Sequence, residues 1–257
     1  MTVKTEIEAA KAALHRAKSS LVAAIDADKT RMRGPKIRQL HEIRRMLEPG
    51  YPYFAQAGQD AIVDRILGHK DGGTFLDIGG YDGITGSNTL FFELRRNWTG
   101  VLVEPVSAHL EKAVAARKCP CIGCAVAKTD GTQDLMEIHE GYTQMSGLVE
   151  SYEPAMLQQV RNNPRHRETV VKVETRTLKR IISDAGLKSV DFISLDIEGG
   201  EFDVLKTFPF DEIRVSVWAI ENNTGKPDMA LFMRDKGYDL VEFCGPDEIY
   251  VSKDLAA

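Results

Sequence analysis

The chain has 257 residues, a length that suits one α/β domain with an extension or two small domains. Its composition, 43% apolar and 28% charged, is that of a globular protein, and no apolar run is long enough for a membrane helix. The net charge of −5 divides into +5 for residues 1–48 and −10 for the remainder, so the acidic body lacks the basic footprint of a nucleic-acid-binding protein.

Residues 4–47 are predicted to form two helices. Apolar residues recur at steps of three and four, first at Ile7, Ala10, Leu14, Ala17, Leu21 and Ile25, then at Ile37, Leu40, Ile43 and Met46. The pair Gly34–Pro35 is expected to break the helix, and the run EPGYPYF from Glu48 reads as a linker. The sequence therefore separates an extension, residues 1–48, from a domain of residues 49–257. The extension is either a dimerisation arm, giving a homo-oligomer, or a flap packed on its own domain.

From Phe54 onward, helical and strand patterns alternate. Helices are predicted at residues 57–67, 88–96, 107–118, 200–208 and 226–237. Strands are predicted at residues 74–78, 100–105, 121–127, 134–140, 169–178, 191–197 and 213–222, with a closing hairpin of residues 238–243 and 248–253. This alternation predicts an α/β fold in which a doubly wound, mainly parallel sheet is covered on both faces.

Three of the four cysteines cluster in CPCIGC, which raises the question of a metal site. On a strand, Cys119 and Cys121 would share a face and Cys124 would point the other way, while Cys244 is distant in the sequence. Because a tetrahedral zinc site needs four converging ligands, small buried core residues are the favoured interpretation. Free thiols and an N-terminus without an apolar secretion core predict a cytoplasmic protein.

Acidic residues close three predicted core strands: Asp77, Glu104 and Asp196. The carboxyl ends of parallel strands face the crevice in which such sheets bind ligands, so these acids are expected to share one edge. Gly79, Gly80 and Gly83 follow the first strand in DIGGYDG, where the absence of Cβ atoms lets a ligand approach the backbone.

The spacing of these acids favours a nucleoside without a diphosphate. Glu104 follows Asp77 by 27 residues and is placed to accept hydrogen bonds from two ribose hydroxyls. A dinucleotide fingerprint would read G-x-G-x-x-G, and Asp77 and Asp82 would repel its pyrophosphate. A ligand with an ammonium and a sulfonium group, such as S-adenosylmethionine, would be attracted instead. This argues against the alternative of an NAD-dependent oxidoreductase.

Seven stretches of the chain resemble the FkbM-type methyltransferases, within the class I S-adenosylmethionine-dependent methyltransferases. They are FAQAGQD, FLDIGGYDGITGSNTLFFE, WTGVLVEP, CAVAKTDG, VKVETRTL, DFISLDIEGGEFDVLKTFPF and AIENN, in order between residues 54 and 250. Residues 1–48 lie outside the resemblance. The resemblance implies a Rossmann-like, seven-stranded methyltransferase domain in residues 49–257 and methylation of a hydroxyl group.

The resemblance also implies which residues bind the cofactor. They are Gln56, Asp77, Gly79, Gly80, Tyr81, Gly83, Asn88, Glu104, Pro105, Ala125, Val126 and Asp196. The glycine loop would cradle the methionine part of the cofactor. Glu104 would bind the ribose, and Ala125 and Val126 would line the adenine. Asn88 would reach the amino-acid end, which Gln56 would cap.

Asp196 and Glu198 would lie beside the sulfonium and the acceptor, and two devices could activate the acceptor hydroxyl. In the first, Asp196, Glu198 or Glu221 takes its proton directly. In the second, Mg²⁺ or another divalent cation bound by Asp196, Glu221 and Asn222 lowers the pKa of the hydroxyl. The alternative is that Glu221 and Asn222 only bond the loops. Asn222 stands where the family pattern leads us to expect a histidine, so a base in that position is absent here.

Residues 141–168 fit no core strand and are expected to form a loop at the ligand edge. Arg161, Arg165, His166 and Arg167 could bind a phosphate of a nucleotide-linked or lipid-linked sugar, although a solvated charged loop is the simpler interpretation. His109 and His139 are expected on a helix surface and a strand surface.

The sequence thus predicts an S-adenosylmethionine-dependent O-methyltransferase that acts on a hydroxyl of a saccharide or a glycosylated or nucleotide-linked sugar. The alternatives are O- or N-methylation of a non-sugar natural product, or a non-catalytic cofactor-binding scaffold. The acidic body suits a neutral small molecule or glycan, or a bound cation, and no nucleic acid.

Overall fold

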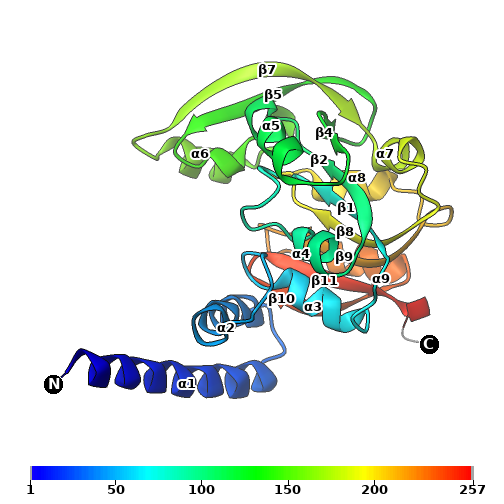
Figure 1. Ribbon diagram of the computed structural model, residues 1–257. Helices are drawn as coiled ribbons and strands as arrows, with labels where there is room; N and C mark the ends of the chain where they lie inside the picture. Colours follow the sequence, from blue (N-terminus) through cyan, green and yellow to red (C-terminus); the bar gives the residue numbers. More distant parts are fainter. Residues whose placement is uncertain (1, 256–257) are drawn as a thin grey trace.

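The computed structural model describes residues 2–255 and contains a central seven-stranded sheet with strand order β10-β11-β9-β8-β1-β2-β3 (Figure 1). The strands β1 (Thr74–Ile78), β2 (Thr99–Val103), β3 (Cys121–Ile122), β8 (Ser189–Leu195) and β9 (Arg214–Glu221) run parallel to one another. Strand β11 (Asp247–Ser252) is antiparallel to both β9 and β10 (Tyr238–Cys244). The predicted doubly wound, mainly parallel sheet and its closing hairpin are confirmed.

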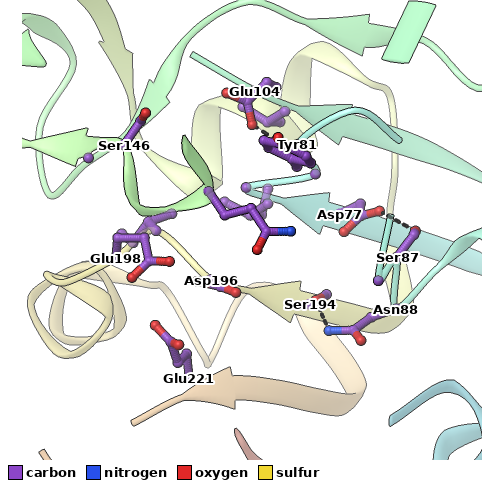
Figure 2. A pocket seen from close by; sticks show the side chains of 18 of the residues that line it. Asp77, Tyr81, Ser87, Asn88, Glu104, Ser146, Ser194, Asp196, Glu198 and Glu221 are labelled. Atoms are coloured by element: carbon purple, nitrogen blue, oxygen red, sulfur yellow. Dashed lines mark hydrogen bonds between the residues drawn. The ribbon is translucent and has the colours of Figure 1, made fainter. Parts of the chain in front are cut away.

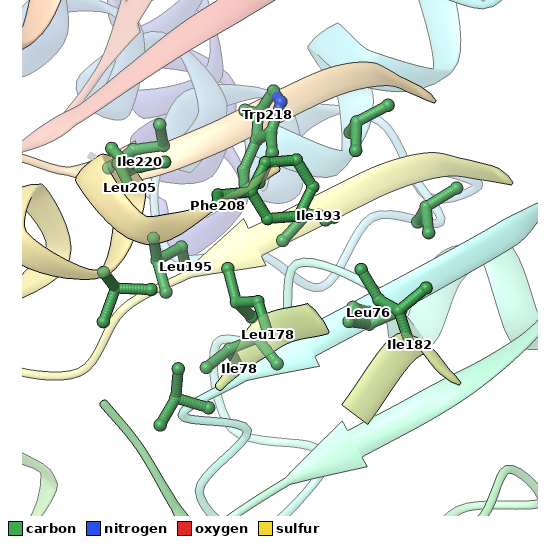
Figure 3. Close-up of a cluster of buried hydrophobic side chains, with 14 of the residues drawn as sticks. Leu76, Ile78, Leu178, Ile182, Ile193, Leu195, Leu205, Phe208, Trp218 and Ile220 are labelled. Carbon is green, nitrogen blue, oxygen red and sulfur yellow. The ribbon is translucent and has the colours of Figure 1, made fainter. Parts of the chain in front are cut away.

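Alternating strand residues supply a core on each face of the sheet. Leu76, Ile193 and Trp218 face one core, which is closed by α7 (Leu178–Asp184), α8 (Glu201–Thr207) and α9 (Asp228–Asp235) (Figure 3). Their sequence neighbours Phe75, Phe192 and Val217 face the opposite core, which contains residues of α3 (Gln59–Ile66) and α4 (Leu90–Arg95). Burial on both faces explains why these strands read as nearly continuous apolar runs. Helix α5 (Ser107–Ala116) follows β2.

A second, four-stranded sheet with order β4-β7-β5-β6 lies beside the central sheet and was not predicted. It consists of β4 (Ala125–Val126), β5 (Gly131–Glu140), β6 (Gly147–Leu148) and β7 (Arg167–Arg176), with β5 and β7 antiparallel. Short helices η1 (Thr143–Met145), η2 (Val149–Ser151) and α6 (Pro154–Arg161) lie between β5 and β7, and η3 (Lys253–Leu255) follows β11. The β5–β7 ribbon arches over one end of the domain (Figure 1).

The prediction of a single strand at residues 121–127 is wrong. The chain leaves the central sheet after β3, and β4 pairs with β7 in the second sheet. Gly123 and Cys124 make the transition, and buried Cys124 packs into the main core. Periodicity along one segment carries no information on which sheet its residues join, so two short strands in succession read as one.

The N-terminal extension forms α1 (Val3–Ala27) and α2 (Arg33–Leu47). The helix break predicted at Gly34–Pro35 lies instead at residues 28–32, because Pro35 falls in the first turn of α2, where proline is tolerated. Gly34 is required by a close approach: a Cβ there would lie 2.3 Å from the carbonyl oxygen of Gly245, and the Gly245 N–H donates to the Gly34 carbonyl at 3.1 Å.

Two ion pairs, one from the first residue of α2 and one from the turn that precedes it, hold the N-terminal extension on the β10–β11 hairpin. Arg33 bonds both oxygens of Glu242 at 2.6 Å, and Arg31 pairs with Glu248 at 2.5 Å. By contrast, the N-terminal half of α1 projects away from the domain, with Ile7 50% exposed (Figure 1). Across residues 2–255, no helix combines the length and the apolar character needed to cross a bilayer.

Candidate active site

A cavity of about 240 Å³ lies at the carboxyl ends of β1, β2, β8 and β9 (Figure 2). The loop after β1 forms its floor, and the backbone there needs glycine. Gly79 has φ +80°, and a Cβ on it would lie 1.7 Å from the carbonyl oxygen of Asp196. A Cβ on Gly80 would overlap the side chain of Leu102. The cavity and the loop therefore occupy the edge that the sequence predicted.

Asp77 points away from solvent and organises this loop. Its carboxylate accepts hydrogen bonds from Thr89 Oγ1 at 2.5 Å and Ser87 Oγ at 3.2 Å, and it pairs with the fully buried Arg117 at 3.2 Å. Asp82 bonds within its own turn, to the N–H groups of Ile84 and Thr85. Arg117 therefore offsets the charge of Asp77 in the expected repulsion of a pyrophosphate. Asp82 keeps its negative charge, because the hydrogen bonds it accepts outweigh the effect of burial and lower its pKa. Arg117 was missed, since nothing local in the sequence marks it.

Glu104 lies at the end of β2 and is held in place by backbone donors. Its two carboxylate oxygens accept hydrogen bonds from the N–H groups of Tyr81 and Val106, each at 2.9 Å. His109 packs beside it, with Nδ1 3.7 Å from Glu104 Oε1 and its ring 4.2 Å from that of Tyr81. The prediction of His109 on a helix surface is wrong, because it is 7% exposed and lines the cavity. His139, as predicted, lies on a strand surface.

Residues of the second sheet close the cavity from the side. Ala125 and Val126 of β4 line it, as do Pro105, Leu135 of β5 and Leu148 of β6. This apolar wall is the part of the cavity best suited to a flat aromatic ring. Leu135 and Leu148 were missed, because their place in the cavity depends on the pairing of β5 with β6 and β7.

At the opposite end, the cavity is lined by polar side chains from several elements. Asn88 donates to Ser194 Oγ at 2.9 Å, and its own Oδ1 is buried without a hydrogen-bond partner. Gln56 also lines the cavity, as do two residues that sequence reasoning missed. Asp247 is buried and accepts a hydrogen bond from Gln59 at 2.9 Å, and Arg38 reaches the cavity from α2.

Asp196, Glu198 and Glu221 form an acid cluster at the ends of β8 and β9, with one oxygen of each within 4.8 Å of the others (Figure 2). Each has one buried carboxylate oxygen without a hydrogen-bond partner. Burial, reinforced by the neighbouring carboxylates, raises the pKa of Asp196 to about 7, that of Glu198 to about 9, and that of Glu221 well above its usual range.

The loop carrying Glu198 adopts an unusual backbone conformation. Glu198 has φ +58°, a region that side-chain-bearing residues rarely occupy and that clusters at functional sites. Glu201 stabilises this loop by accepting hydrogen bonds from the N–H groups of Ile197 and Gly199, both at 3.0 Å. The strained loop therefore directs the Glu198 carboxylate toward Glu221.

Asn222 does not join the acid cluster, which corrects its expected place in a metal ligand set. Its amide nitrogen donates to Glu248 Oε1 at 2.9 Å and to the Lys226 carbonyl at 3.1 Å. Its oxygen accepts from Thr224 at 2.8 Å and Gly225 at 3.1 Å. Both ends of the amide are therefore used, and Asn222 bonds the loop after β9. A cation at this position would find Glu198 as the third oxygen ligand.

A second cavity, of about 390 Å³, adjoins the first and shares Glu198 and Glu221 with it. The charged side chains around it are mostly acidic: Glu150, Glu153, Glu198, Glu201, Asp203, Glu221 and Asp228, against Lys128 and Lys226. Any group bound here would lie next to the acid cluster.

Neither cavity is lined by Arg161, Arg165, His166 or Arg167, the basic residues of segment 141–168. Arg161 pairs with Glu168 at 2.5 Å, and His166 pairs with the same carboxylate at 2.7 Å. Arg167 donates to the backbone carbonyl of His166. The structure therefore favours the simpler interpretation of a solvated charged segment over a phosphate site.

Comparison with known proteins gives a family match. A family model described as "Methyltransferase FkbM domain" matches residues 77–240. Among solved structures, methyltransferase FkbM from Methylobacillus flagellatus KT is similar at 15% identity and a TM-score of 0.49, covering 92% of this chain and 58% of that one. The chain thus spans less than two thirds of that protein's length.

Two structures of METTL16 are also similar. The METTL16 MTase domain gives a TM-score of 0.45 at 12% identity, over 86% of this chain and 81% of that one. The N-terminal domain of human METTL16 gives 0.44 at 12% identity, over 84% and 81%. A search of curated proteins found no match.

Proposed function

The chain belongs to the FkbM methyltransferase family, and from this premise we propose that it transfers a methyl group from S-adenosylmethionine to a hydroxyl of a small, hydroxyl-rich acceptor such as a saccharide. The observation that carries the proposal is the position of the acid cluster. Asp196, Glu198 and Glu221 line the first cavity together with the glycine loop and Glu104, and Glu198 and Glu221 also line the second.

The residues of the first cavity fit S-adenosylmethionine. Glu104 is oriented by two N–H donors and keeps lone pairs for the ribose hydroxyls. The unpartnered Asn88 Oδ1 suits the cofactor's ammonium group, and the apolar wall around Ala125 and Val126 suits its adenine. Glycine at position 79 lets the loop after β1 lie against the Asp196 carbonyl oxygen, which a Cβ would overlap, and so brings the end of β8 up to the glycine loop that lines the cavity. The cofactor would supply a methyl group already activated by its sulfonium.

The acid cluster would take up the acceptor's proton. Because the pKa of Asp196 is about 7, its carboxylate is both available near neutral pH and basic enough to accept a proton during transfer. Glu198, whose pKa is raised to about 9, remains protonated near neutral pH and can donate a hydrogen bond that orients the acceptor oxygen, and burial also raises the pKa of Glu221. Such general-base assistance contributes roughly 10²–10⁴-fold, in addition to the advantage of placing the two reactants together.

A divalent cation is the alternative device, and its ligands would be Asp196, Glu198 and Glu221. Three carboxylate oxygens suit Mg²⁺, and binding would lower the pKa of all three groups. We favour direct proton acceptance, because the pKa of Asp196, about 7, already makes its carboxylate a suitable base near neutral pH. Methyl transfer that continues in EDTA supports this choice, whereas activity lost in EDTA and restored by Mg²⁺ requires the cation.

The second cavity indicates which acceptors fit. Its acidic surroundings disfavour a phosphate, none of the arginines of residues 141–168 lines it, and Arg161 is paired with Glu168. A neutral or amine-bearing sugar is therefore the favoured acceptor, ahead of a nucleotide-linked sugar, and a non-sugar natural product with the same hydroxyl and amine chemistry is the runner-up. The four free cysteines suit a reducing compartment, and we place the reaction in the cytoplasm.

The test is to incubate the protein with S-adenosylmethionine labelled in its methyl group and with panels of neutral, amino and nucleotide-linked sugars. Labelled neutral or amino sugar, with S-adenosylhomocysteine formed in equal amount, supports the proposal. Binding of S-adenosylhomocysteine without transfer to any acceptor would favour a cofactor-binding scaffold. Label on a nitrogen alone would replace O-methylation by N-methylation.

A further inference from the structure

The first cavity offers many negative charges and few positive charges to the proposed cofactor. Its lining includes six carboxylates, from Asp77, Glu104, Asp196, Glu198, Glu221 and Asp247. Among the described residues that line it, Arg38 is the single lysine or arginine. The methionine part of the cofactor carries two positive groups and one carboxylate, and that carboxylate has no other cationic partner of this kind in the lining.

Contacts on both sides of Arg38 fix its place. One turn before it on α2, Gly34 touches Gly245, two residues from Asp247. One turn after it, His41 packs against Gly58, so closely that a Cβ on this glycine would lie 3.0 Å from the imidazole Nδ1. Arg38 therefore lies between the β10–β11 turn and the segment that precedes α3. Gln56 belongs to that segment and lines the same end of the cavity.

The guanidinium of Arg38 remains available for a ligand. Its Nε lies 3.3 Å from Glu42 one turn along α2, and its side chain is 50% exposed. Glu42 is itself 48% exposed, so this is a surface ion pair of the kind that contributes little and is readily exchanged. A carboxylate at the cavity mouth would offer the guanidinium a bidentate partner.

We propose that Arg38 binds the carboxylate of the cofactor's methionine part, so that the N-terminal extension completes the cofactor site. The inference rests on the proposed use of S-adenosylmethionine. It assigns a binding role to a residue outside the matched segment 77–240. The contacts of Arg31, Arg33 and Gly34 with the β10–β11 hairpin would then also position Arg38 for cofactor binding.

The test compares two ligands by calorimetry: S-adenosylhomocysteine, which carries the carboxylate, and 5′-methylthioadenosine, which lacks the amino-acid part. Arg38→Ala is expected to weaken binding of S-adenosylhomocysteine about 10- to 100-fold, as for loss of a charge-assisted hydrogen bond. Its affinity for methylthioadenosine is expected to stay within about twofold. Arg38→Lys should retain part of the difference, because the charge remains without the bidentate geometry.

Arg45→Ala is the matched control, because Arg45 is exposed on the same helix and does not line the cavity. It should leave both affinities unchanged, and equal melting temperatures would show that all variants fold. The inference is overturned if Arg38→Ala leaves S-adenosylhomocysteine binding intact or weakens both ligands equally. If the unaltered protein binds neither ligand, the proposed function fails as well, which separates the two cases.

Discussion

The carboxylate of Glu104 accepts a hydrogen bond of 2.9 Å from the backbone N–H of Tyr81, and this bond joins the end of β2 to the glycine loop that follows β1. Tyr81 has φ +50°, so the loop turns sharply at this residue. The same interaction orients Glu104 before any ligand arrives. Tyr81 and Glu104, which are 23 residues apart in the sequence, thereby combine the ends of two strands into one binding surface.

Replacing Glu104 should damage cofactor binding. Glu104→Ala removes the carboxylate proposed to hold the ribose, and its loss is expected to raise the Kd for S-adenosylhomocysteine roughly 10- to 100-fold. Glu111→Ala, an exposed acid on α5, is the control for the change in charge. Equal affinities of Glu104→Ala and the unaltered protein, measured by calorimetry, would remove Glu104 from the site.

The rate of methyl transfer should depend on pH through Asp196. A base must be deprotonated, so kcat/KM is expected to rise with pH, to bend near the pKa of about 7, and to level off above it. In Asp196→Asn this limb should disappear together with roughly 10²–10⁴-fold of the rate. A profile that is flat from pH 5.5 to 8.5 in the unaltered protein would exclude Asp196 as the base.

Glu221→Gln should lower the rate of methyl transfer and raise the stability of the fold. The folded-state pKa of Glu221 is raised, so the group contributes most favourably at low pH and this contribution is lost as pH rises above the unfolded value of about 4.3. A glutamine does not ionise, so it avoids the cost of burying a carboxyl group above the pKa that this group has in the unfolded chain. The variant should therefore be more stable than the unaltered protein at pH 8, by about 1–3 kcal/mol, while the difference shrinks near pH 4.

Thermal or urea unfolding at both pH values measures this difference. Glu212→Gln is the control, because Glu212 is a surface acid in an exposed ion pair with Lys179. A Glu221→Gln variant that is less stable than the unaltered protein at pH 8 would mean that the carboxylate is satisfied in solution, by a cation or by water.

Exposed apolar residues on α1 are consistent with the predicted dimerisation arm, which can be tested. Val3 and Ile7 are 72% and 50% exposed, and they continue the helical face that farther along carries the buried Ile25. If two chains pair through this stripe, Ile7→Lys should convert a dimer to a monomer in light scattering. Glu8→Lys, on the same turn, should not. A monomeric unaltered protein at about 100 μM would discard the arm as a dimer contact.

The sequence was a good guide to the central sheet, because its strands are buried on both faces and are separated by helices with clear apolar periods. Asp77, Glu104 and Asp196 could be placed at one edge by the general geometry of parallel sheets alone. The second sheet was beyond reach, because β4 and β6 are two residues long and are defined only by their partners β7 and β5.

The site residues that were missed share one property: they reach the cavity through long-range contacts. Arg117 is drawn to Asp77 and Glu93 by charge, Arg38 arrives on a helix from outside the domain body, and His109 turns inward to Tyr81. The local spacing of residues in the sequence does not predict these contacts. Conversely, Asn222 had the right chemistry for a ligand, and only the loop bonds around it reveal that its amide is occupied.

Titration of the intact protein with S-adenosylhomocysteine and, separately, with NADH tests the central claim most directly. We predict saturable one-to-one binding of S-adenosylhomocysteine and no heat of binding with NADH. Saturable binding of NADH together with an absence of binding to S-adenosylhomocysteine would contradict the account.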